Sequence, residues 1–434
     1  MFRSITAEVQ EKLLHFIWKH RKFPFGGLRT TKGMPLHISF PGTENELGGP
    51  DFQYASILLD GLEWAGPVEI HIRSLDWYAH QHQLDAAYDN VILHVVWEVN
   101  GEVYRKDGSC IPCLELKEVV SRTLLDQYAQ LFLHKRDRKL LCEEAIRRVP
   151  RPVVSDWLQL LFTERLRQKS KYIQLLLNET RNDWEHVFFR VLLKCFGLNH
   201  NGPAFESLGN ALPFSVLRRY RTHPVRLEAL LFGMIGLLDN NPNSDHYYLA
   251  LQKEYRYLIT LHQLRGDAVL KPHFFKLRPG NFPTIRLSQF CSLYTGQVSL
   301  FGKVIQANTK AGLRDVLRSR AGPYWDNHYT FGTLTPSKPK WSSTRFLDLL
   351  IINAVLPVKY SYAQHRGENE WPLLTKISGE LKAEQNHITR IFSKVGVSVT
   401  QAIESQALVQ LYNDYCSKNK CLQCAVGCYL LSGK

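Results

Sequence analysis

The chain has 434 residues, of which 44% are hydrophobic and 12% aromatic, enough apolar surface for two or three globular domains. Fifty-four Lys and Arg against forty Asp and Glu give a formal net charge of +14, which favours a polyanionic partner such as nucleic acid. Its apolar runs fall short of the roughly 18–20 residues of a membrane span, and its first residues lack the apolar stretch of a signal peptide. We therefore expect a cytoplasmic protein that does not enter a membrane.

The first hundred residues alternate between helix and strand signals. Apolar residues from Ile5 to Ile17 recur at helical spacing, which predicts an amphipathic helix that ends before Gly26-Gly27. Runs of strand-forming residues predict strands at 35–40, 52–59, 67–72 and 91–96, with a helix or ordered loop over 76–88. The order α-β-β-β-α-β predicts an α+β domain at residues 1–113.

The rest of the chain is predicted to be mostly helical. Long helical periodicities begin near residue 114, and a segment rich in Pro and Arg at 271–286 interrupts them. We divide this region into a helical domain at 114–270, a second helical block at 271–415 that can pack with the first, and a cysteine-rich tail at 416–434. The expected fold class is therefore α+β, a small sheet domain followed by helices.

Polar residues that suit a divalent cation converge on the predicted strands. Asp51 precedes the second strand and Glu69 lies in the third, so antiparallel pairing would bring their carboxylates side by side. Glu69 and His71 are two residues apart and point to one face of the strand. Mg²⁺ and Mn²⁺ prefer carboxylate oxygens, and a bound cation can polarise a phosphate and activate water. The alternative is a solvated strand face after an ordinary Gly-Pro-Asp turn.

Pro50-Asp51, followed after seventeen residues by Glu69-Ile70-His71, resembles the signature of the PD-(D/E)XK nucleases. The predicted order of elements is similar to the restriction-endonuclease-like core of that superfamily. The resemblance implies that Asp51, Glu69 and the backbone carbonyl of Ile70 hold Mg²⁺ or Mn²⁺. It also implies hydrolysis of phosphodiester bonds in nucleic acid, with DNA favoured over RNA.

Residue 71 departs from the PD-(D/E)XK signature, and the accessory acid of that superfamily must be sought elsewhere in the chain. His71 stands where the superfamily has lysine, and a neutral imidazole can act as a base or a ligand but lacks the fixed positive charge. The resemblance also implies an accessory acid on the first helix. Glu11 is the candidate, or Glu8 if the register differs.

Further polar side chains follow the third predicted strand. His80, His82 and Asp85 are spaced like metal ligands or phosphate-contacting groups, and His-x-His would suit a second metal. The alternative is a polar helix start, with His94 a core histidine in the last strand. A different hypothesis places His80, His82 and His94 around a transition metal in an enzyme for small substrates.

Nine cysteines are too few for a secreted disulfide scaffold, and four of them lie in the last nineteen residues. The spacing Cys416-x4-Cys421-x2-Cys424-x3-Cys428 offers four soft ligands, which fits Zn²⁺ or a [4Fe–4S] cluster. Cys428 can instead be a buried residue of a terminal helix. Cys142 lies in an apolar helical stretch and is interpreted as a core residue.

The helical region carries the strongest positive charge. Cationic helices could hold a phosphate backbone beside the metal site, although a charged run is often only a solvated helix face. The candidate nucleic-acid-binding residues are Arg136, Arg138, Lys139, Arg218, Arg219 and Arg221.

The whole chain resembles an uncharacterised bacterial family known only as a domain of unknown function, number 2851. The matching phrases include Gly49-Pro50-Asp51-Phe52, Val68-Glu69-Ile70-His71 and the closing segment from Tyr415-Cys416 to Cys424. This resemblance implies no activity. The leading hypothesis is a metal-dependent nuclease. The alternatives are a non-catalytic nucleic-acid-binding protein with a degenerate nuclease fold and the histidine-based enzyme.

Overall fold

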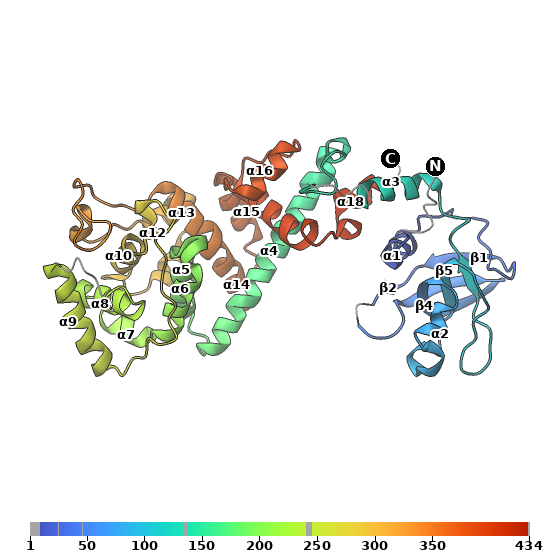
Figure 1. The fold of residues 1–434 in the computed structure, drawn as a ribbon, viewed down its shortest axis with the longest axis horizontal. Coiled ribbons are helices and arrows are strands. Elements are labelled where there is room, and N and C mark those ends of the chain that lie inside the picture. The colour runs from blue at the N-terminus through green and yellow to red at the C-terminus, as the bar shows by residue number, and fades with distance from the viewer. Residues whose placement is uncertain (1–8, 25, 46, 133–137, 240–244, 433–434) are drawn as a thin grey trace. The chain divides into compact units, whose positions relative to one another are not determined.

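The computed structural model describes all residues except 1–8, 25, 46, 133–137, 240–244 and 433–434 (Figure 1). The chain forms two compact units. The first, the sheet unit, comprises residues 1–157, 394–397 and 411–434, and the second, the helical unit, comprises 158–393 and 398–410. The predicted boundary at 113/114 falls within a strand of the sheet unit, and the cysteine-rich tail belongs to that same unit. The protein is therefore a mixed α+β protein.

The sheet unit is built on six strands. β1 (Leu36–Phe40), β3 (Phe52–Leu59) and β4 (Leu62–Arg73) pair antiparallel, and β5 (Leu93–Glu98) and β6 (Cys113–Glu115) follow in parallel. The order is β1-β3-β4-β5-β6, and β2 (Thr43–Glu44) pairs with β3. The four predicted strands are confirmed. The short β2 and β6 were not predicted.

Apolar packing holds the elements around the predicted site residues in place. α1 (Glu11–Lys19) buries Leu13, Leu14, Phe16 and Ile17 and packs against β4. Every residue of β5 from Leu93 to Trp97 is buried, as expected for a parallel strand covered on both faces. The predicted helix or loop at 76–88 consists of α2 (Asp76–Ala79), η2 (His82–Leu84) and η3 (Ala86–Tyr88). A small core of Trp77, Tyr88, Val91, Val103 and Ile111 anchors it.

The sheet unit also contains helices from distant parts of the sequence. They are α3 (Arg122–Phe132), η4 (Ile146–Arg148), the start of α4 (Arg151–Glu179), η8 (Tyr412–Cys416), η9 (Cys421–Gln423) and α18 (Ala425–Leu430). α1 packs against η9, so the C-terminal tail lies against the first helix of the same unit.

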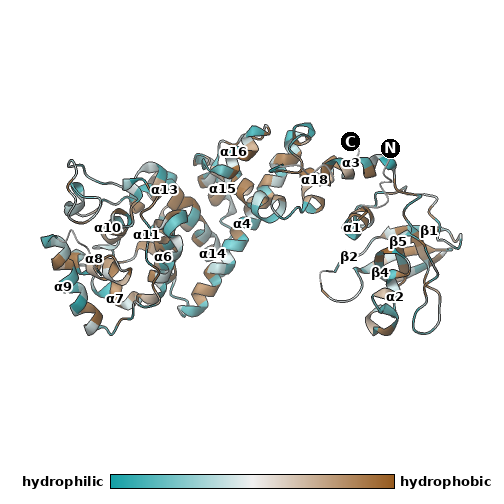
Figure 2. Ribbon diagram, in the orientation of Figure 1, coloured by the Kyte–Doolittle hydropathy of each residue, from teal (hydrophilic) through white to brown (hydrophobic). Residues whose placement is uncertain are grey.

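The helical unit confirms the predicted helical region. Its helices alternate hydrophilic and hydrophobic residues, as the teal and brown bands show (Figure 2). The elements are α5 (Trp184–Phe196), α6 (Leu198–Ala211), α7 (Phe214–Arg219), α8 (Pro224–Met234), α9 (His246–Leu261), η5 (Pro279–Asn281), α10 (Pro283–Tyr294), α11 (Leu300–Gln306), α12 (Lys310–Leu317), η6 (Pro323–Asp326), α13 (Thr344–Leu350), η7 (Ile351–Val355), α14 (Leu356–Arg366), α15 (Trp371–Glu380), α16 (His387–Lys394) and α17 (Ala402–Leu411).

One apolar helical segment is longer than the sequence predicted. α13, η7 and α14 continue into one another over Thr344–Arg366, which is long and apolar enough to cross a membrane by length and composition alone. However, 72% of its apolar window is buried inside the protein, as in the central helix of a folded domain.

Candidate metal centre

The carboxylates of Asp51 and Glu69 meet where β3 begins beside β4. The backbone N–H of Asp51 donates to Glu69 Oε2 at 3.0 Å, and the backbone N–H of Ile70 donates to Asp51 Oδ2 at 3.0 Å. Phe52 pairs with Val68, so Asp51 stands just beyond the last paired residue, next to Glu69. The antiparallel pairing brings the two acids together as the sequence predicts.

The backbone of Ile70 also faces this position. Ile70 pairs with Val95 of β5 on one edge of β4, while its N–H points to Asp51 on the other. In an extended strand the N–H and C=O of one residue point to the same edge. The carbonyl of Ile70 is therefore on the side of Asp51, which suits its predicted place beside a cation.

A third acid and an unpredicted histidine come from α1. Ligand atoms of Glu11, His15 and Asp51 all lie within 4.8 Å of one another, and His15 Nε2 is 3.4 Å from Asp51 Oδ2. Burial and the charge of Asp51 raise the pKa of Glu11. Burial alone would lower the pKa of His15, but the hydrogen bond and charge of Asp51 outweigh it and raise that pKa. Glu8 lies outside the described residues.

A group of three histidines adjoins the acids. Ligand nitrogens of His71, His80 and His82 lie within 4.8 Å of one another. Glu69 connects the two groups, because its Oε1 is 3.2 Å from His82 Nε2 and 3.5 Å from His71 Nε2. His82 also stacks on Tyr88 at 3.8 Å between ring centroids.

His94 supports this group from behind. His71 Nδ1 lies 2.8 Å from His94 Nε2, and His71 Nε2 lies 3.0 Å from His80 Nδ1, so hydrogen bonds hold the His71 ring on both sides. His94 is 0% exposed within β5 and does not belong to the three-histidine group. It therefore orients His71, as partners of metal-binding histidines commonly do.

Burial sets the charge of the central residues. Burial and the charge of Asp51 raise the pKa of Glu69 to about 9, although the Asp51 N–H bond opposes this shift. Burial and the neighbouring His94, His80 and His82 lower the pKa of His71 to about 2. Burial and His82 lower the pKa of His94 to about 3. His71 is therefore a neutral imidazole across the physiological range and does not supply the positive charge of a lysine.

The donor set fits divalent cations. Glu11, Asp51, Glu69 and the Ile70 carbonyl offer oxygens for Mg²⁺ or Mn²⁺, and three imidazoles beside Glu69 suit Mn²⁺, Fe²⁺ or Zn²⁺. Within the described part of the chain, the buried Nε2 atom of His82 has no hydrogen-bond partner, although Glu69 Oε1 lies 3.2 Å away. A neutral imidazole nitrogen coordinates a cation through its lone pair, so His82 Nε2 can serve as a ligand.

Asp85 is not part of this arrangement. It is exposed, and its side chain accepts a hydrogen bond from the backbone N–H of Ala87 at 2.9 Å, which caps η3.

His15 was not predicted from the sequence, although it lies four residues after Glu11 and therefore on the same face of α1. That spacing was the available signal.

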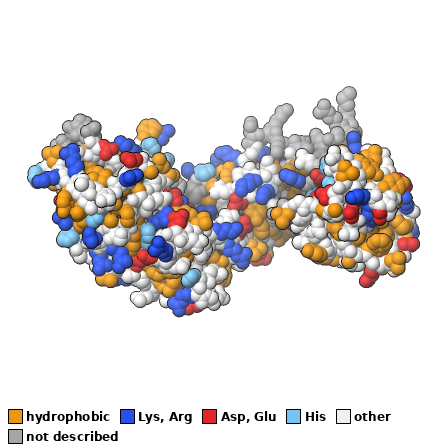
Figure 3. Space-filling view, turned by 90° about the horizontal axis from the view of Figure 1, so that it is seen from below, with side chains coloured by type: hydrophobic (Ala, Val, Ile, Leu, Met, Phe, Trp, Pro, Cys, Tyr) orange, Lys and Arg blue, Asp and Glu red, His pale blue; other side chains and the backbone are white. Residues whose placement is uncertain are grey.

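The predicted basic residues are distributed over both units. Arg138 pairs with Glu144 at 2.7 Å in the sheet unit, and Lys139 is exposed there. Arg218, Arg219 and Arg221 lie in the helical unit, the first two exposed at the end of α7. Arg136 lies outside the described residues. Figure 3 shows Lys and Arg side chains spread over the visible face of each unit.

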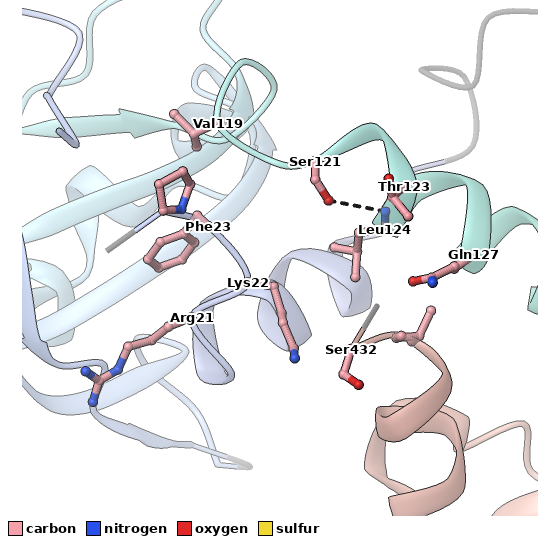
Figure 4. A pocket seen from close by; sticks show the side chains of 11 residues that line it. Arg21, Lys22, Phe23, Val119, Ser121, Thr123, Leu124, Gln127 and Ser432 are labelled. Atoms are coloured by element: carbon pink, nitrogen blue, oxygen red, sulfur yellow. Dashed lines mark hydrogen bonds between the residues drawn. The ribbon is translucent and has the colours of Figure 1, made fainter. Parts of the chain in front are cut away.

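A separate hollow lies in the sheet unit away from the acids and histidines. Its volume is about 320 Å³, and its walls come from Arg21 to Pro24, from residues 119–127 and from Leu431 and Ser432 (Figure 4). Its lining includes none of the residues of the two ligand groups described above. The chemistry-bearing residues and this cavity are therefore distinct features.

The structure also locates the tail cysteines. Cys416 ends η8, Cys421 begins η9, and Cys424 precedes α18, so three of the four share one short loop. Cys428 lies within α18, as the alternative expected, but it is half-buried rather than buried, and its thiol donates to the Leu422 carbonyl at 3.3 Å.

The chain is thus a mixed α+β protein in which acids and histidines gather beside the central strand β4 of its sheet. It belongs to a family of proteins of unknown function, DUF2851, whose model matches residues 11–387. No curated protein and no solved structure matches it.

Proposed function

We propose that the sheet unit is a metal-dependent nuclease that hydrolyses phosphodiester bonds, with DNA as the favoured substrate. The observation that carries this proposal is the meeting of Asp51, Glu69 and the Ile70 backbone at one edge of β4, where two 3.0 Å hydrogen bonds fix both carboxylates. A cation held there would polarise a phosphate oxygen and lower the pKa of an attacking water.

The order of elements supports the same proposal. α1 is followed by the antiparallel strands β1, β3 and β4, then by α2 and by β5 parallel to β4. This is the α-β-β-β-α-β order of the PD-(D/E)XK nucleases that the sequence motif resembles. The closeness of Glu11 on α1 to Asp51 supports its proposed role as the accessory acid.

In this proposal His71 serves as a neutral residue. With its pKa far below 7, it can accept a proton from water or bind a cation, but it cannot stabilise negative charge as an ammonium group would. The positive charge near the phosphate then comes from the cation and from His15, whose pKa is raised. The net charge of +14 favours binding of the polyanion.

The test is cleavage of labelled single- and double-stranded DNA and RNA by the full chain, stripped of metal and then given Mg²⁺ or Mn²⁺. Glu69→Gln removes the buried carboxylate, whereas Glu63→Gln changes an exposed carboxylate on the same strand and is the matched control. The proposal expects cleavage by the wild type and the control and its loss in Glu69→Gln. Tight binding of nucleic acid without cleavage by any of them would favour the non-catalytic binding protein.

A second function is favoured by one observation. His71, His80 and His82 with Glu69 form three imidazoles and a carboxylate, a set that suits a transition metal in an enzyme for small substrates. Purified protein that retains Fe or Zn after Mg²⁺ exchange, loses it on His80→Ala and cleaves no nucleic acid would support this candidate against the nuclease.

A further inference from the structure

The strand β3 contains a bulge close to the metal centre. Phe52 pairs with Val68 of β4. The next pair is Ala55 with Gly66, so β3 advances by three residues where β4 advances by two. Within the bulge stands Tyr54, whose φ of 60° lies in the left-handed region. A tyrosine in that region is a conformational outlier, because its Cβ crowds the backbone there.

The side chain of Tyr54 gives the fold little in return for this strain. It is 79% exposed, and among the described residues its hydroxyl has no hydrogen-bond partner. Glycine would adopt the same φ without the crowding. Strained residues persist mainly where the surrounding structure holds them for a function, and bulges beside active sites often redirect a side chain. The strain at Tyr54 therefore points to a role outside folding.

The loop between β1 and β2 fixes the bulge from one side. A Cβ atom at Gly42 would lie 2.7 Å from the carbonyl oxygen of Gln53 and 3.2 Å from the nitrogen of Ala55. These two residues flank Tyr54 in the chain. The φ of Gly42 is itself positive, at 91°, so glycine is required here both for its conformation and for the close approach. The backbone that presents Tyr54 is consequently held in place.

The same loop is tied to the helix that carries part of the metal centre. The carbonyl of Pro41 accepts a hydrogen bond from the indole N–H of the buried Trp18 at 2.8 Å. Trp18 lies on α1, and ligand atoms of Glu11 and His15 on that helix lie within 4.8 Å of a carboxylate oxygen of Asp51. One set of contacts therefore holds both the bulge and the metal centre.

Tyr54 is within reach of a strand bound at the metal centre. It follows Asp51 by three residues, which span at most about 10 Å of extended chain. Stacked nucleotides follow one another at about 3.4 Å, so this span covers about three of them. A second exposed ring is close by, because Phe40 is 46% exposed and pairs with Ser56, two residues after Tyr54.

We infer that the ring of Tyr54 stacks on an unpaired base of the nucleic acid and positions the strand at the metal centre. The class of ligand rests on the proposed function. Every base has a flat π face, so stacking on an aromatic ring tolerates any sequence. Bases inside a duplex are already stacked on one another, so the ring favours a single strand or an unpaired duplex end.

The test is binding of single-stranded DNA to the full chain in the presence of a chelator, which prevents metal-dependent cleavage. The DNA carries, at successive positions, a fluorescent adenine analogue whose emission falls when it stacks. Wild type and Tyr54→Phe should bind and quench the analogue, and Tyr54→Leu should bind roughly tenfold more weakly without quenching. Tyr257→Leu, which changes an exposed tyrosine of α9 in the helical unit, is the matched control and should behave as the wild type does. Equal binding and quenching by Tyr54→Leu, or no quenching by the wild type, would overturn the inference.

A further variant separates binding from folding. Tyr54→Gly relieves the strained φ, so it should melt at the wild-type temperature or above it and yet fail to quench the analogue. A lower melting temperature with unchanged DNA binding would assign the ring to the fold and overturn the inference. Loss of a dimer in ultracentrifugation, again with unchanged DNA binding, would assign it to a contact between copies of the chain.

The binding assay also distinguishes this inference from the proposed function. Quenching by a wild type that cleaves no nucleic acid with Mg²⁺ or Mn²⁺ would support base stacking and reject the nuclease. Metal-dependent cleavage without any quenching would support the nuclease and reject the role of Tyr54.

Discussion

The backbone N–H of Asp51 donates a 3.0 Å hydrogen bond to Oε2 of Glu69, so the two acids are held together by the main chain. Glu69 is only 4% exposed, and a buried carboxylate must either hold a proton or meet a positive charge. The raised pKa of Glu69 corresponds to the protonated state. A bound cation would supply the positive charge and favour the ionised state.

This competition predicts that cation affinity depends on pH. Because the pKa of Glu69 is raised to about 9, a proton occupies the carboxylate below that pH and must leave when Mn²⁺ binds. We expect the apparent Mn²⁺ affinity to rise by about tenfold per pH unit as the pH approaches 9. Calorimetry in buffers of different ionisation enthalpy measures the released proton. Affinity in the wild type that is constant with pH would contradict this reading, and Glu69→Gln is the control that should show no such release.

The raised pKa of Glu69 also predicts how the stability of the metal-free protein changes with pH. An acid whose pKa is raised by folding contributes stability that is fully present below its unfolded pKa and is lost as the pH rises toward about 9. We therefore expect Mn²⁺ to raise the melting temperature of the sheet unit more at alkaline than at mildly acidic pH. Equal stabilisation at both pH values would show that Glu69 does not bind the cation.

The histidine chain gives a second, independent prediction. The pKa values of His71 and His94 are lowered to about 2 and 3, so both rings should remain neutral at about pH 6 while His15, with a raised pKa, gains its proton above the usual range. NMR titration of labelled histidines reads each ring separately. A ring of His71 that titrates near its ordinary pKa would contradict the buried hydrogen-bonded chain.

These lowered pKa values also predict acid sensitivity. The unfolded chain takes up protons on His71 and His94 below about pH 6.5, whereas the folded chain does not, so stability is retained above that pH and lost as the pH falls toward 3. Each histidine contributes up to about 1.4 kcal/mol per pH unit. Urea unfolding of wild type and His94→Gln at several pH values tests this, because the variant should lose part of the slope.

Packing at the tail predicts the effect of a small substitution. Gly427→Ala would place a methyl group against the Cys421 carbonyl, and we expect it to destabilise the sheet unit by about 1–3 kcal/mol. Gly280→Ala is the control, because nothing lies within 4 Å of a Cβ at that position. Thermal unfolding monitored in both variants gives the comparison, and equal melting temperatures would argue against the close contact.

Much of the sheet unit could be predicted from the sequence because its signals are local. Apolar strand runs and the two-residue spacing of Glu69 and His71 depend on neighbouring residues alone. β2 and β6 could not be predicted because strands of two and three residues carry too little pattern.

The remaining features depend on contacts between distant segments. His94 was interpreted as a core residue and is buried, but its hydrogen bond to His71 comes from the parallel pairing of β4 with β5. Cys142 was interpreted as a core residue, and it is buried. The hydrophobic pattern of a sequence predicts which side chains are buried. Which residue a buried side chain then contacts depends on how distant segments pack together.

The most direct test of the proposed metal-dependent hydrolysis is single-turnover cleavage of labelled double-stranded DNA by wild type, Asp51→Asn and Glu63→Gln, each saturated with Mn²⁺. The site geometry predicts that Asp51→Asn slows cleavage by at least about 100-fold while Glu63→Gln cleaves as the wild type does. Cleavage by Asp51→Asn at the rate of Glu63→Gln would contradict the assignment of the site.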